Sequence, residues 1–356
     1  MDTPSTGKTT SRRRRSVSTG NGAPTLKTVA DAAGVSIAIV SRVVNGLYHG
    51  MTADTRARVE AAIDELSYRP NRAARSLRTK RSYRVAIIAV DTSPEFLADP
   101  FTTYLLAGFS NALSEQNYGL LVQRLDPSAP AEALLARVQD ADALSLYMSG
   151  PRADRLALIE RCRVLGLPLL VFQEVLPAPI EGDVAVVRQD DRSGGRWLGE
   201  RIRRNRLSDI LAVVPILGWP AIEERLAGLR EGVADSAEPR VLPVLETDMR
   251  AVAAALDGCL ATAMPEVIVC SNDQLAAQAM AAVGRTGRRV PDDVRVSGFN
   301  HFLITGSVTP PLTTVRSPAF HLGVEAAHLI TQRLDQGRFR TSEIVLPVEY
   351  VVGQTL

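Results

Sequence analysis

The first part of the chain has the hydrophobic periodicity of helices. Over residues 25–33, 36–45 and 52–66, apolar side chains recur at intervals of three and four, so each segment can bury one face. Gly34 follows the last apolar residue of the first segment, where a residue suited to the left-handed conformation ends a helix. The pattern therefore predicts three short helices with a tight turn between the first two, which is a helix-turn-helix layout.

Hydroxyl side chains stand at the start of each predicted helix. Thr25, Ser36 and Thr52 open the three segments. Such residues cap helices, because their side-chain oxygen accepts a hydrogen bond from a free backbone N–H of the first turn. We expect all three to be N-caps.

From residue 83 the apolar positions form short continuous runs separated by helical stretches. Such runs are typical of strands in a parallel sheet that is covered on both faces. The expected strands are 85–90, 119–123, 143–148, 167–172, 183–187, 209–214, 266–270 and 294–299. Residues 104–115 and 131–138 are expected helices. The predicted fold class is α/β: a helix-turn-helix head, then two lobes of doubly wound parallel sheet with a ligand cleft at the carboxyl ends of the strands.

The distribution of charge favours a nucleic-acid partner for the first part of the chain. Residues 1–82 hold 15 Lys or Arg against 6 Asp or Glu, whereas the remainder holds 26 against 33. A basic head on an acidic body is the electrostatic arrangement that a nucleic-acid binder needs. Residues 1–24, rich in Ser, Thr, Gly and Arg, are expected to be a disordered basic tail, which either adds non-specific DNA affinity or is inert.

Several other classes of protein are disfavoured. The three cysteines are scattered and the four histidines include no adjacent ligand pair, so we expect neither a disulfide framework nor a metal site. No apolar run is long enough for a membrane span, and none follows the arginines of residues 12–15 as in a secretory signal. Enzyme and phosphate-loop motifs are missing too. We expect a cytoplasmic protein without a cofactor; an enzyme that uses the cleft is the alternative from another class.

A basic segment separates the head from the two lobes. Proline disfavours the helical conformation of the residue before it, so Pro70 ends the third helix. Residues 71–81 then combine Lys and Arg side chains with a few apolar ones. The segment is either a short hinge helix or a solvated basic linker.

Three motifs of the head follow one another in a specific order. G-V-S-x-x-x-V-S-R-V-x-N-G spans residues 34–46, T-R-x-R-V spans 55–59 and L-x-Y-R-P-N-x-x-A-R-S-L spans 66–77. Together they resemble the LacI/GalR family of bacterial transcription regulators. The resemblance extends from residue 25 to about residue 352, which is nearly the whole chain.

The resemblance implies the domain organisation. After the tail come a DNA-binding head at 25–69, a hinge helix or linker at 70–82, and a core at 83–356 that is like a periplasmic binding protein. In the family the core chain crosses three times between an N-lobe and a C-lobe. We place these lobes at about 83–182 plus 316–345 and at about 183–313 plus 346–356, with crossings near 181–183, 313–316 and 345–348.

The second helix of the family lies in the DNA major groove. The resemblance thus implies that Ile37 and Ala38 face the bases in its first turn, with Arg42 one turn on. Ile37 and Ala38 can read only shape and thymine methyl groups, whereas Arg42 can make a bidentate contact to guanine. Ser36, Ser41 and Asn45 suit phosphates, which position the helix without reading sequence. The other expected DNA-binding residues are Thr25, Asn71, Arg72, Ala74 and Leu77.

Three further positions of the head and hinge either match a special role in the family or differ from its usual residue. Leu77 matches the family's minor-groove leucine, an apolar wedge that parts base steps; the alternative is that it packs against its dimer mate or the core. Ile39 replaces the usual Thr, which removes a phosphate contact. Thr28 replaces the usual Asp, which should weaken the cap of the first helix by about 1 kcal/mol.

The resemblance also implies an effector site in the cleft, with Phe101, Trp219 and Arg225 among its residues. Phe101 belongs to the family's N-P-F segment, in which Asp99 replaces Asn here, and it either stacks on a sugar ring or is a core residue. Trp219 lies at the family's pocket rim, although Trp is also a common core residue. Arg225 has the planar fork that binds hydroxyls or a carboxylate.

Two asparagines complete the expected effector site. Asn272 directly follows a strand, where ligands bind in open sheets, and it can donate and accept hydrogen bonds. Asn300 replaces the family's usual Asp, so a charge-assisted acceptor is lost. Asp191 and Asp273 precede helical stretches and are expected to cap them rather than to contact ligand.

The predicted function combines these sites. The resemblance implies a homodimer that binds double-stranded, near-palindromic operator DNA, most often as a repressor, under control of a small-molecule effector that is most often a sugar. Control requires that the effector bind two arrangements of the lobes with different affinity. The alternative is the same regulator sensing a nucleobase, nucleoside or phosphorylated metabolite, which Asn300 keeps open.

Overall fold

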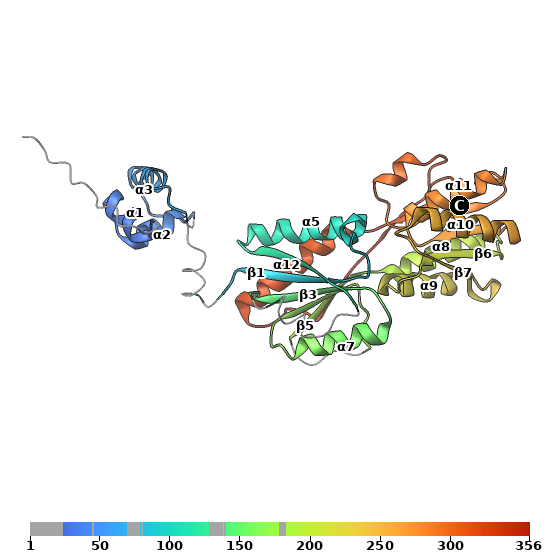
Figure 1. Ribbon diagram of the computed structural model, residues 1–356, viewed down its shortest axis with the longest axis horizontal. Coiled ribbons are helices and arrows are strands. Elements are labelled where there is room, and N and C mark those ends of the chain that lie inside the picture. Colours follow the sequence, from blue (N-terminus) through green and yellow to red (C-terminus); the bar gives the residue numbers. More distant parts are fainter. Residues whose placement is uncertain are drawn as a thin grey trace, which may run out of the picture. The chain divides into compact units, whose positions relative to one another are not determined.

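The computed structural model describes residues 24–44, 46–69, 79, 81–127, 138, 140–177 and 183–356. Contacts divide the chain into two compact units, Met1–Arg81 and Ser82–Leu356, each with its own hydrophobic core (Figure 1). The predicted helix at 131–138 and most of the hinge at 70–82 lie outside the described residues.

The first unit contains the three predicted helices, α1 (Leu26–Ala33), α2 (Ile37–Val44) and α3 (Ala53–Glu65). Their apolar faces meet in a small core whose buried members are Val29, Ala30, Ala33, Val40, Val43, Val59, Ala62 and Tyr68. The turn after α1 is made by Gly34, whose φ of 66° lies in the left-handed region that favours glycine. The helix-turn-helix prediction is therefore confirmed.

The N-caps of this unit are hydroxyl side chains. Thr25 accepts from the backbone N–H of Thr28, and Thr52 accepts from that of Thr55. Thr28 also returns the bond, because its hydroxyl oxygen accepts from the Thr25 N–H at 2.8 Å. We expected Thr28 to weaken this cap, but it supplies the second half of a capping box.

The first lobe of the second unit is built on a six-stranded parallel sheet with the strand order β11-β5-β4-β3-β1-β2. Its strands are β1 (Arg84–Val90), β2 (Gly119–Leu125), β3 (Ala143–Met148), β4 (Leu169–Phe172), β5 (Val184–Gln189) and β11 (Glu343–Leu346). Helices α5 (Pro100–Glu115) and α12 (Ala319–Gln336) cover one face and α7 (Arg152–Arg163) covers the other (Figure 1). Successive side chains of β1 serve the two faces, since Val85 and Ile87 pack with α5 while Ala86 and Ile88 pack with α7.

The second lobe repeats this design on a four-stranded parallel sheet with the order β7-β6-β8-β9. Its strands are β6 (Ile210–Pro215), β7 (Arg240–Val244), β8 (Val267–Cys270) and β9 (Arg295–Ser297). Its helices are α8 (Asp191–Arg204), α9 (Pro220–Val233), α10 (Met249–Thr262) and α11 (Asp273–Arg285). Helices α10 and α11 pack on one face and α8 and α9 on the other. Short 3-10 helices are η1 (Phe96–Ala98), η2 (Ala234–Ser236) and η3 (Leu303–Ser307).

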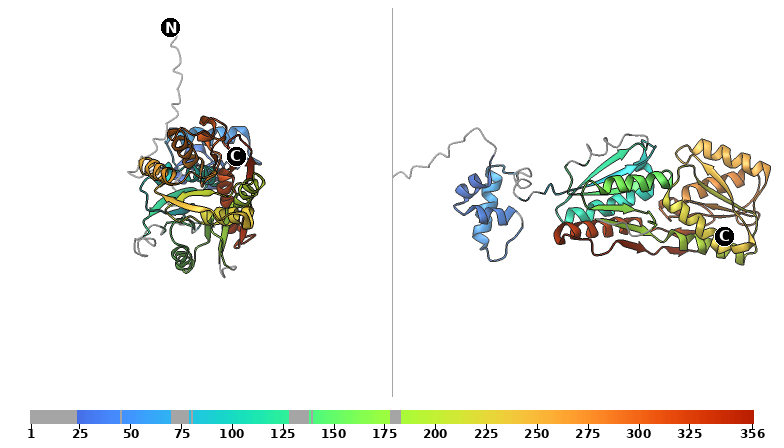
Figure 2. Two further views of the ribbon diagram at one scale, coloured as in Figure 1. Left: turned by 90° about the vertical axis from the view of Figure 1, so that its right-hand side faces the viewer. Right: turned by 90° about the horizontal axis from the view of Figure 1, so that it is seen from below.

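The chain passes between the lobes along neighbouring segments. Strands β10 (Thr314–Arg316) and β12 (Glu349–Val351) form an antiparallel pair on this path, and the right-hand view in Figure 2 shows the two lobes joined by such segments. The predicted first crossing near 181–183 is wrong, because β5 pairs with β4 and β11 in the first lobe. The chain leaves that lobe after Gln189. An apolar run such as 183–187 predicts a strand but does not say which sheet it joins.

Helices α8 and α9 approach each other closely through glycine. A Cβ at Gly195 would lie 2.1 Å from the Arg225 carbonyl oxygen, and one at Gly228 would lie 2.0 Å from that of Arg192. Only glycine allows this spacing, which fixes the backbone of Arg225 against α8.

Candidate functional site

The start of α2 presents apolar side chains to solvent. Ile37 is 48% exposed and Ala38 is exposed as well, while Val40 and Val43 of the same helix are buried. The Ser36 hydroxyl accepts from the Ile39 N–H at 3.4 Å. Arg42, one turn on, donates from Nη2 to the carbonyl oxygen of His49. The face of α2 that is predicted to meet DNA is therefore open to solvent, and Arg42 is engaged by His49.

Only some of the residues predicted to bind DNA belong to the described part of the chain. Thr25 and Ser36 are exposed and Ser41 is half-buried. The remaining predictions, Asn45, Asn71, Arg72, Ala74 and Leu77, lie outside the described residues.

The five residues predicted to bind an effector come together in the second unit. Phe101, Trp219, Arg225, Asn272 and Asn300 all line one cavity of about 240 Å³ between the two lobes. The cavity lies at the carboxyl ends of strands from both sheets, because its lining also includes the residues that directly follow β1, β4 and β8 and residues two positions beyond β6 and β7. Ligands bind at this edge of open parallel sheets.

Aromatic rings form one wall of the cavity. The Tyr147 ring lies between two others, with centroids 6.0 Å from Phe101 and 4.9 Å from Trp219. Phe101 is 5% exposed, so it is a core residue of the first lobe as well as part of the lining. Both roles considered for it from the sequence are thus compatible.

Arg225 is the hub of a polar network beside this wall. Its Nε donates to Asp191 Oδ1 at 2.7 Å, Nη1 to the Ser271 carbonyl at 2.5 Å and Nη2 to Asn300 Oδ1 at 3.2 Å. The guanidinium also lies 3.7 Å from the centre of the Phe299 ring. Arg225 is therefore held rigidly and keeps only part of its donor capacity for a ligand.

Asp191 does not have the predicted role. The N-cap of α8 is Asp190, whose side chain accepts from the Ser193 N–H, whereas Asp191 is buried and accepts from Arg225 and from Gln189 Nε2. Burial raises the pKa of Asp191 and the charge of Arg225 opposes that shift. The sequence offers two adjacent aspartates, and the distant Arg225 decides which one caps.

The predicted cap of α11 is also wrong, because Asn272 and not Asp273 makes it. Asn272 is the N-cap of α11, because its Oδ1 accepts from the Leu275 N–H at 2.8 Å. Asp273 is buried and accepts from the hydroxyls of Thr305 at 3.0 Å and Thr314 at 2.6 Å, so it ties the lobe to a crossing strand. Asn272 still lines the cavity, where its Nδ2 donates to Glu246 Oε2 at 3.3 Å.

Carboxylates that were not singled out from the sequence also line the cavity. Asp91 follows β1, Glu246 follows β7, and Asp99 caps α5 by accepting from the Thr102 N–H at 2.9 Å. Desolvation raises the pKa of Asp91 and of Asp99, and it raises the pKa of Glu246 to about 7 with help from the charges of Asp99 and Asp91. The strand-end rule that singled out Asn272 would have found Asp91 too, whereas Glu246 follows β7, a strand that was not among those expected from the sequence.

An ion-pair cluster links the lobes beside the cavity. Arg155 of α7 is fully buried and contacts Glu174 of its own lobe, with Nε to Oε2 at 2.7 Å. It also contacts Glu223 of α9 in the second lobe, with distances of 3.0 Å and 3.2 Å from its two terminal nitrogens. Nearby, the Gly150 N–H donates to the Gly218 carbonyl at 2.7 Å, again from lobe to lobe. These contacts exist only while the two lobes lie close together.

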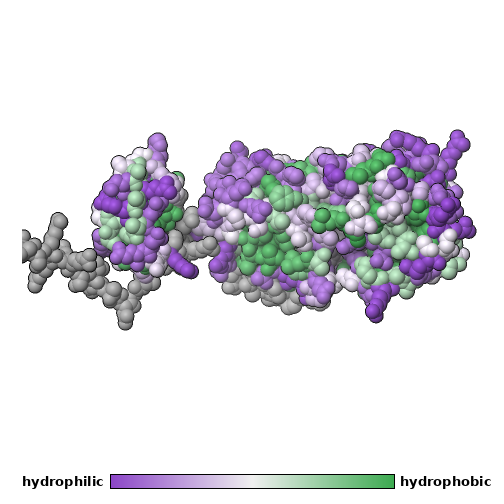
Figure 3. All heavy atoms as spheres, turned by 90° about the horizontal axis from the view of Figure 1, so that it is seen from above, coloured by the Kyte–Doolittle hydropathy of each residue, from purple (hydrophilic) through white to green (hydrophobic). Residues whose placement is uncertain are grey.

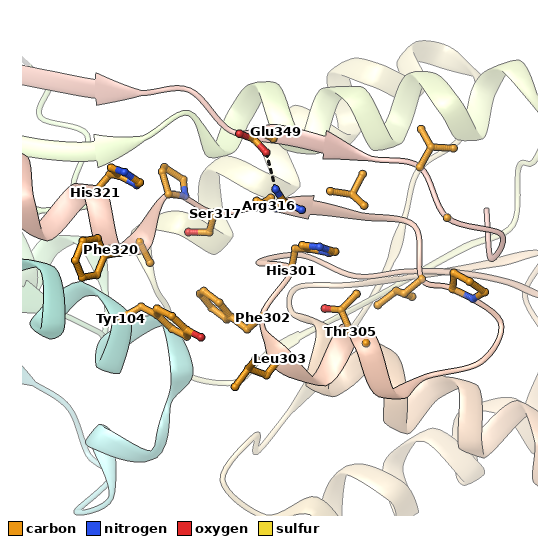
Figure 4. A pocket seen from close by; sticks show the side chains of 18 of the residues that line it. Tyr104, His301, Phe302, Leu303, Thr305, Arg316, Ser317, Phe320, His321 and Glu349 are labelled. Atoms are coloured by element: carbon orange, nitrogen blue, oxygen red, sulfur yellow. Dashed lines mark hydrogen bonds and ion pairs between the residues drawn. The ribbon is translucent and has the colours of Figure 1, made fainter.

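A broader hollow of about 740 Å³ lies elsewhere on the core, lined by residues from α5, η3, α12 and the crossing strands (Figure 4). Tyr104 stacks on Phe302 at 4.9 Å, and Arg316 pairs with Glu349 at 3.0 Å. Leu303 at its edge is 85% exposed. None of the residues predicted from the sequence to bind an effector lines this hollow.

The described residues contain neither a membrane-spanning helix nor a metal-binding cluster. No helix among them is long and apolar enough to cross a membrane. No group of three or more His, Cys, Asp or Glu side chains in the described part of the chain has the arrangement of a metal site.

Known proteins match both units. Residues 25–71 match bacterial regulatory proteins of the lacI family, and residues 217–356 match a periplasmic binding protein-like domain. The HTH-type transcriptional regulator CelR of Thermobifida fusca is 30% identical over 354 residues, which cover 96% of each chain. A solved CelR–cellobiose complex is 27% identical with a TM-score of 0.67 and covers 94% of this chain and 100% of its own. The lac repressor dimer bound to operator and the anti-inducer ONPF is 26% identical with a TM-score of 0.75 and covers 94% and 99%.

A helix-turn-helix head joined to a two-lobed core with a cavity between the lobes defines a two-part DNA-binding transcription regulator. The chain belongs to the LacI family of bacterial transcriptional regulators. The relatives that it matches over nearly their full length are regulators, not enzymes.

Proposed function

We propose that this protein is a repressor that binds a near-palindromic operator as a homodimer and senses a sugar in the cavity between its lobes. The observation that carries the sugar assignment is the convergence of Phe101, Trp219, Arg225, Asn272 and Asn300 on one cavity. Apolar ring faces beside a few fixed polar groups suit a sugar, which has both kinds of surface. The cellobiose complex of a relative similar over most of the chain supports this class of ligand.

On the DNA side, the open face of α2 supports base reading by shape. Ile37 and Ala38 offer no hydrogen-bonding groups, so they suit thymine methyl groups in the major groove. Arg42 is the side chain on this helix that can specify guanine once it leaves His49. We assign Asn71, Arg72, Ala74 and Leu77 to the hinge contact with the minor groove, on the motif alone.

Control by the effector follows from the position of its cavity. A ligand held by groups of both lobes binds the close arrangement better than the open one, and this difference in affinity shifts the lobe equilibrium. The hinge segment enters the first lobe at β1, so a change in the lobes of two paired subunits alters the spacing of their hinges.

The homodimer is proposed on two grounds. The lac repressor of similar structure is a dimer on its operator. In addition, the core face seen in Figure 3 carries hydrophobic surface, and Leu303 and Phe320 beside the hollow of Figure 4 are 85% and 37% exposed. Such side chains are commonly buried by a partner. Multi-angle light scattering tests this: a protein that stays monomeric at micromolar concentration would exclude the dimer. Binding to operator DNA would place the protein in the cytoplasm.

Tryptophan fluorescence tests the cavity directly, because the chain contains only two tryptophans. Trp219 lines the cavity, whereas Trp197 stacks on Tyr350 at 4.8 Å and is not part of the lining. In the Trp197→Phe variant, a panel of mono- and disaccharides should include one that changes the emission of Trp219. The Trp219→Phe variant is the matched control and should show little change with the same sugar. If nucleobases or phosphorylated metabolites change the emission and no sugar does, the sugar assignment is wrong.

A further inference from the structure

We propose that the effector carries a positive charge, and that it is a hexosamine whose ammonium group lies among Asp91, Asp99 and Glu246. The inference rests on the proposed function, since it narrows the class of sugar for the same cavity. Neither the family match nor the cellobiose complex suggests a charged ligand.

The lining of the cavity holds more acidic than basic side chains. Among the described residues that line the cavity, Asp91, Glu95, Asp99 and Glu246 are acidic and Arg225 is basic. The charge of Arg225 is already matched by buried Asp191, which lies 2.7 Å away and is not part of the lining. The lining therefore has a surplus of acidic groups, and its one basic side chain is already paired with a carboxylate outside the lining.

The carboxylates of the lining accept hydrogen bonds from uncharged groups. Asp91 accepts from the Ser93 N–H at 2.9 Å, and Asp99 accepts from the N–H and hydroxyl of Thr102. Glu246 accepts from the amide of Asn272 at 3.3 Å. All of these donors are neutral. Arg124 donates to the Asp91 backbone carbonyl and pairs with Asp126; its charge lowers the pKa of Asp91, but it is not part of the lining.

A buried hydroxyl of the lining has no hydrogen-bond partner among the described residues. Ser271 belongs to the lining, is 7% exposed, and its Oγ has no hydrogen-bond partner among the described residues. A buried polar atom without a partner is costly, so its presence in a binding cavity points to a polar group of the ligand. An ammonium group has three donors and can serve carboxylates and such a hydroxyl together.

The acidic side chains of the lining also repel one another. The negative charges of Asp99 and Asp91 both raise the pKa of Glu246. Hydroxyl groups of a neutral sugar can satisfy carboxylate oxygens but cannot remove this repulsion. A cation removes it, and the Tyr147 and Trp219 rings beside the acids add a favourable surface for a cation.

The test compares matched ligands. Glucose, glucosamine and N-acetylglucosamine differ at one ring substituent, as do the corresponding galactose and mannose sets, and cellobiose pairs with the β-1,4-linked glucosamine disaccharide. Calorimetry with the full-length protein at pH 7 and low salt should show that an amino member binds at least tenfold more tightly than its hydroxyl and N-acetyl counterparts. Raising the salt concentration should weaken the amino member selectively, because screening acts on its charge.

Two variants separate charge recognition from a structural effect. Glu246→Gln keeps the shape of the side chain and should lower affinity for the amino sugar at least fivefold more than it lowers affinity for the hydroxyl sugar. Glu160→Gln on the outer helix α7 is the charge-matched control and should change neither affinity. If a hydroxyl sugar binds as tightly as its amino counterpart, the positive charge is wrong although sugar sensing stands. If no sugar of either kind binds, both the hexosamine and the sugar assignment are wrong.

Discussion

The two glutamates that share Arg155 should respond differently to the same substitution. Glu223 lies in the second lobe with its side chain 40% exposed, whereas Glu174 lies in the first lobe and is fully buried. In Glu223→Gln, Arg155 keeps its pair with Glu174, so no buried charge is left alone. A half-exposed pair of this kind contributes about 1 kcal/mol. Since the pair forms only between lobes in contact, its loss should shift the lobe equilibrium toward opening by about fivefold.

Amide hydrogen exchange of Gly150 measures this opening, because its N–H donates across the lobes to the Gly218 carbonyl. We expect about fivefold faster exchange at Gly150 in Glu223→Gln, with the strand amides of β1 unchanged. In Glu174→Gln the buried guanidinium loses its closest carboxylate, which should lower the free energy of unfolding of the core by about 3 kcal/mol. Urea unfolding followed by tryptophan fluorescence measures that loss. Equal effects of the two substitutions on unfolding, with no change at Gly150, would refute the reasoning.

Three further predictions test the packing, the head and the cavity. Gly195→Ala should lower the free energy of core unfolding in urea by about 2 kcal/mol, because the new Cβ would lie 2.1 Å from the Arg225 carbonyl; Gly258→Ala, with no atom within 4 Å, should instead be neutral or stabilising. Thr25→Ala should destabilise α1 by about 1 kcal/mol, seen as faster amide exchange confined to the head. Glu246 has a folded-state pKa of about 7, raised from 4.5 by desolvation and by Asp99 and Asp91, against hydrogen bonding to Trp219 and the charge of Arg225. Between about pH 4.5 and 7 the folded state thus holds a proton that the unfolded state has lost. The stability contributed by this group therefore falls as pH rises through that range. The difference in unfolding free energy between wild type and Glu246→Gln should fall with pH over the same range.

Sequence periodicity predicted the elements better than it predicted their partners. The helices of the head and the turn at Gly34 follow from local patterns, and the structure confirms them. The strand expected at 183–187 is present as β5 (Val184–Gln189), but it was assigned to the wrong lobe. Pairing depends on contacts with β4 and β11, which are far away in the sequence, so a local pattern does not determine it.

The same distinction holds for the cavity. The strand-end rule and family motifs brought together residues that do line one cavity, such as Trp219 and Asn300. The roles of Asp191 and Asp273 were wrong because a neighbouring residue caps each helix, while long-range partners engage these aspartates. The surplus of acidic groups in the lining was missed for a related reason, since it becomes evident only once the structure shows which residues line the cavity and that Arg225 is paired.

The central claim is that a small molecule in the interlobe cavity controls DNA binding by the head. The most direct measurement begins with genomic fragments that the purified protein retains at a stated salt concentration, because affinity depends steeply on salt. Fluorescence anisotropy of the most enriched fragment is then titrated with the sugar that changes Trp219 emission. We expect the affinity of the wild type for the fragment to change at least tenfold on saturation and that of Trp219→Ala to change little at the same sugar concentration. A sugar that binds in the cavity and leaves the DNA affinity of the wild type unchanged would contradict the account.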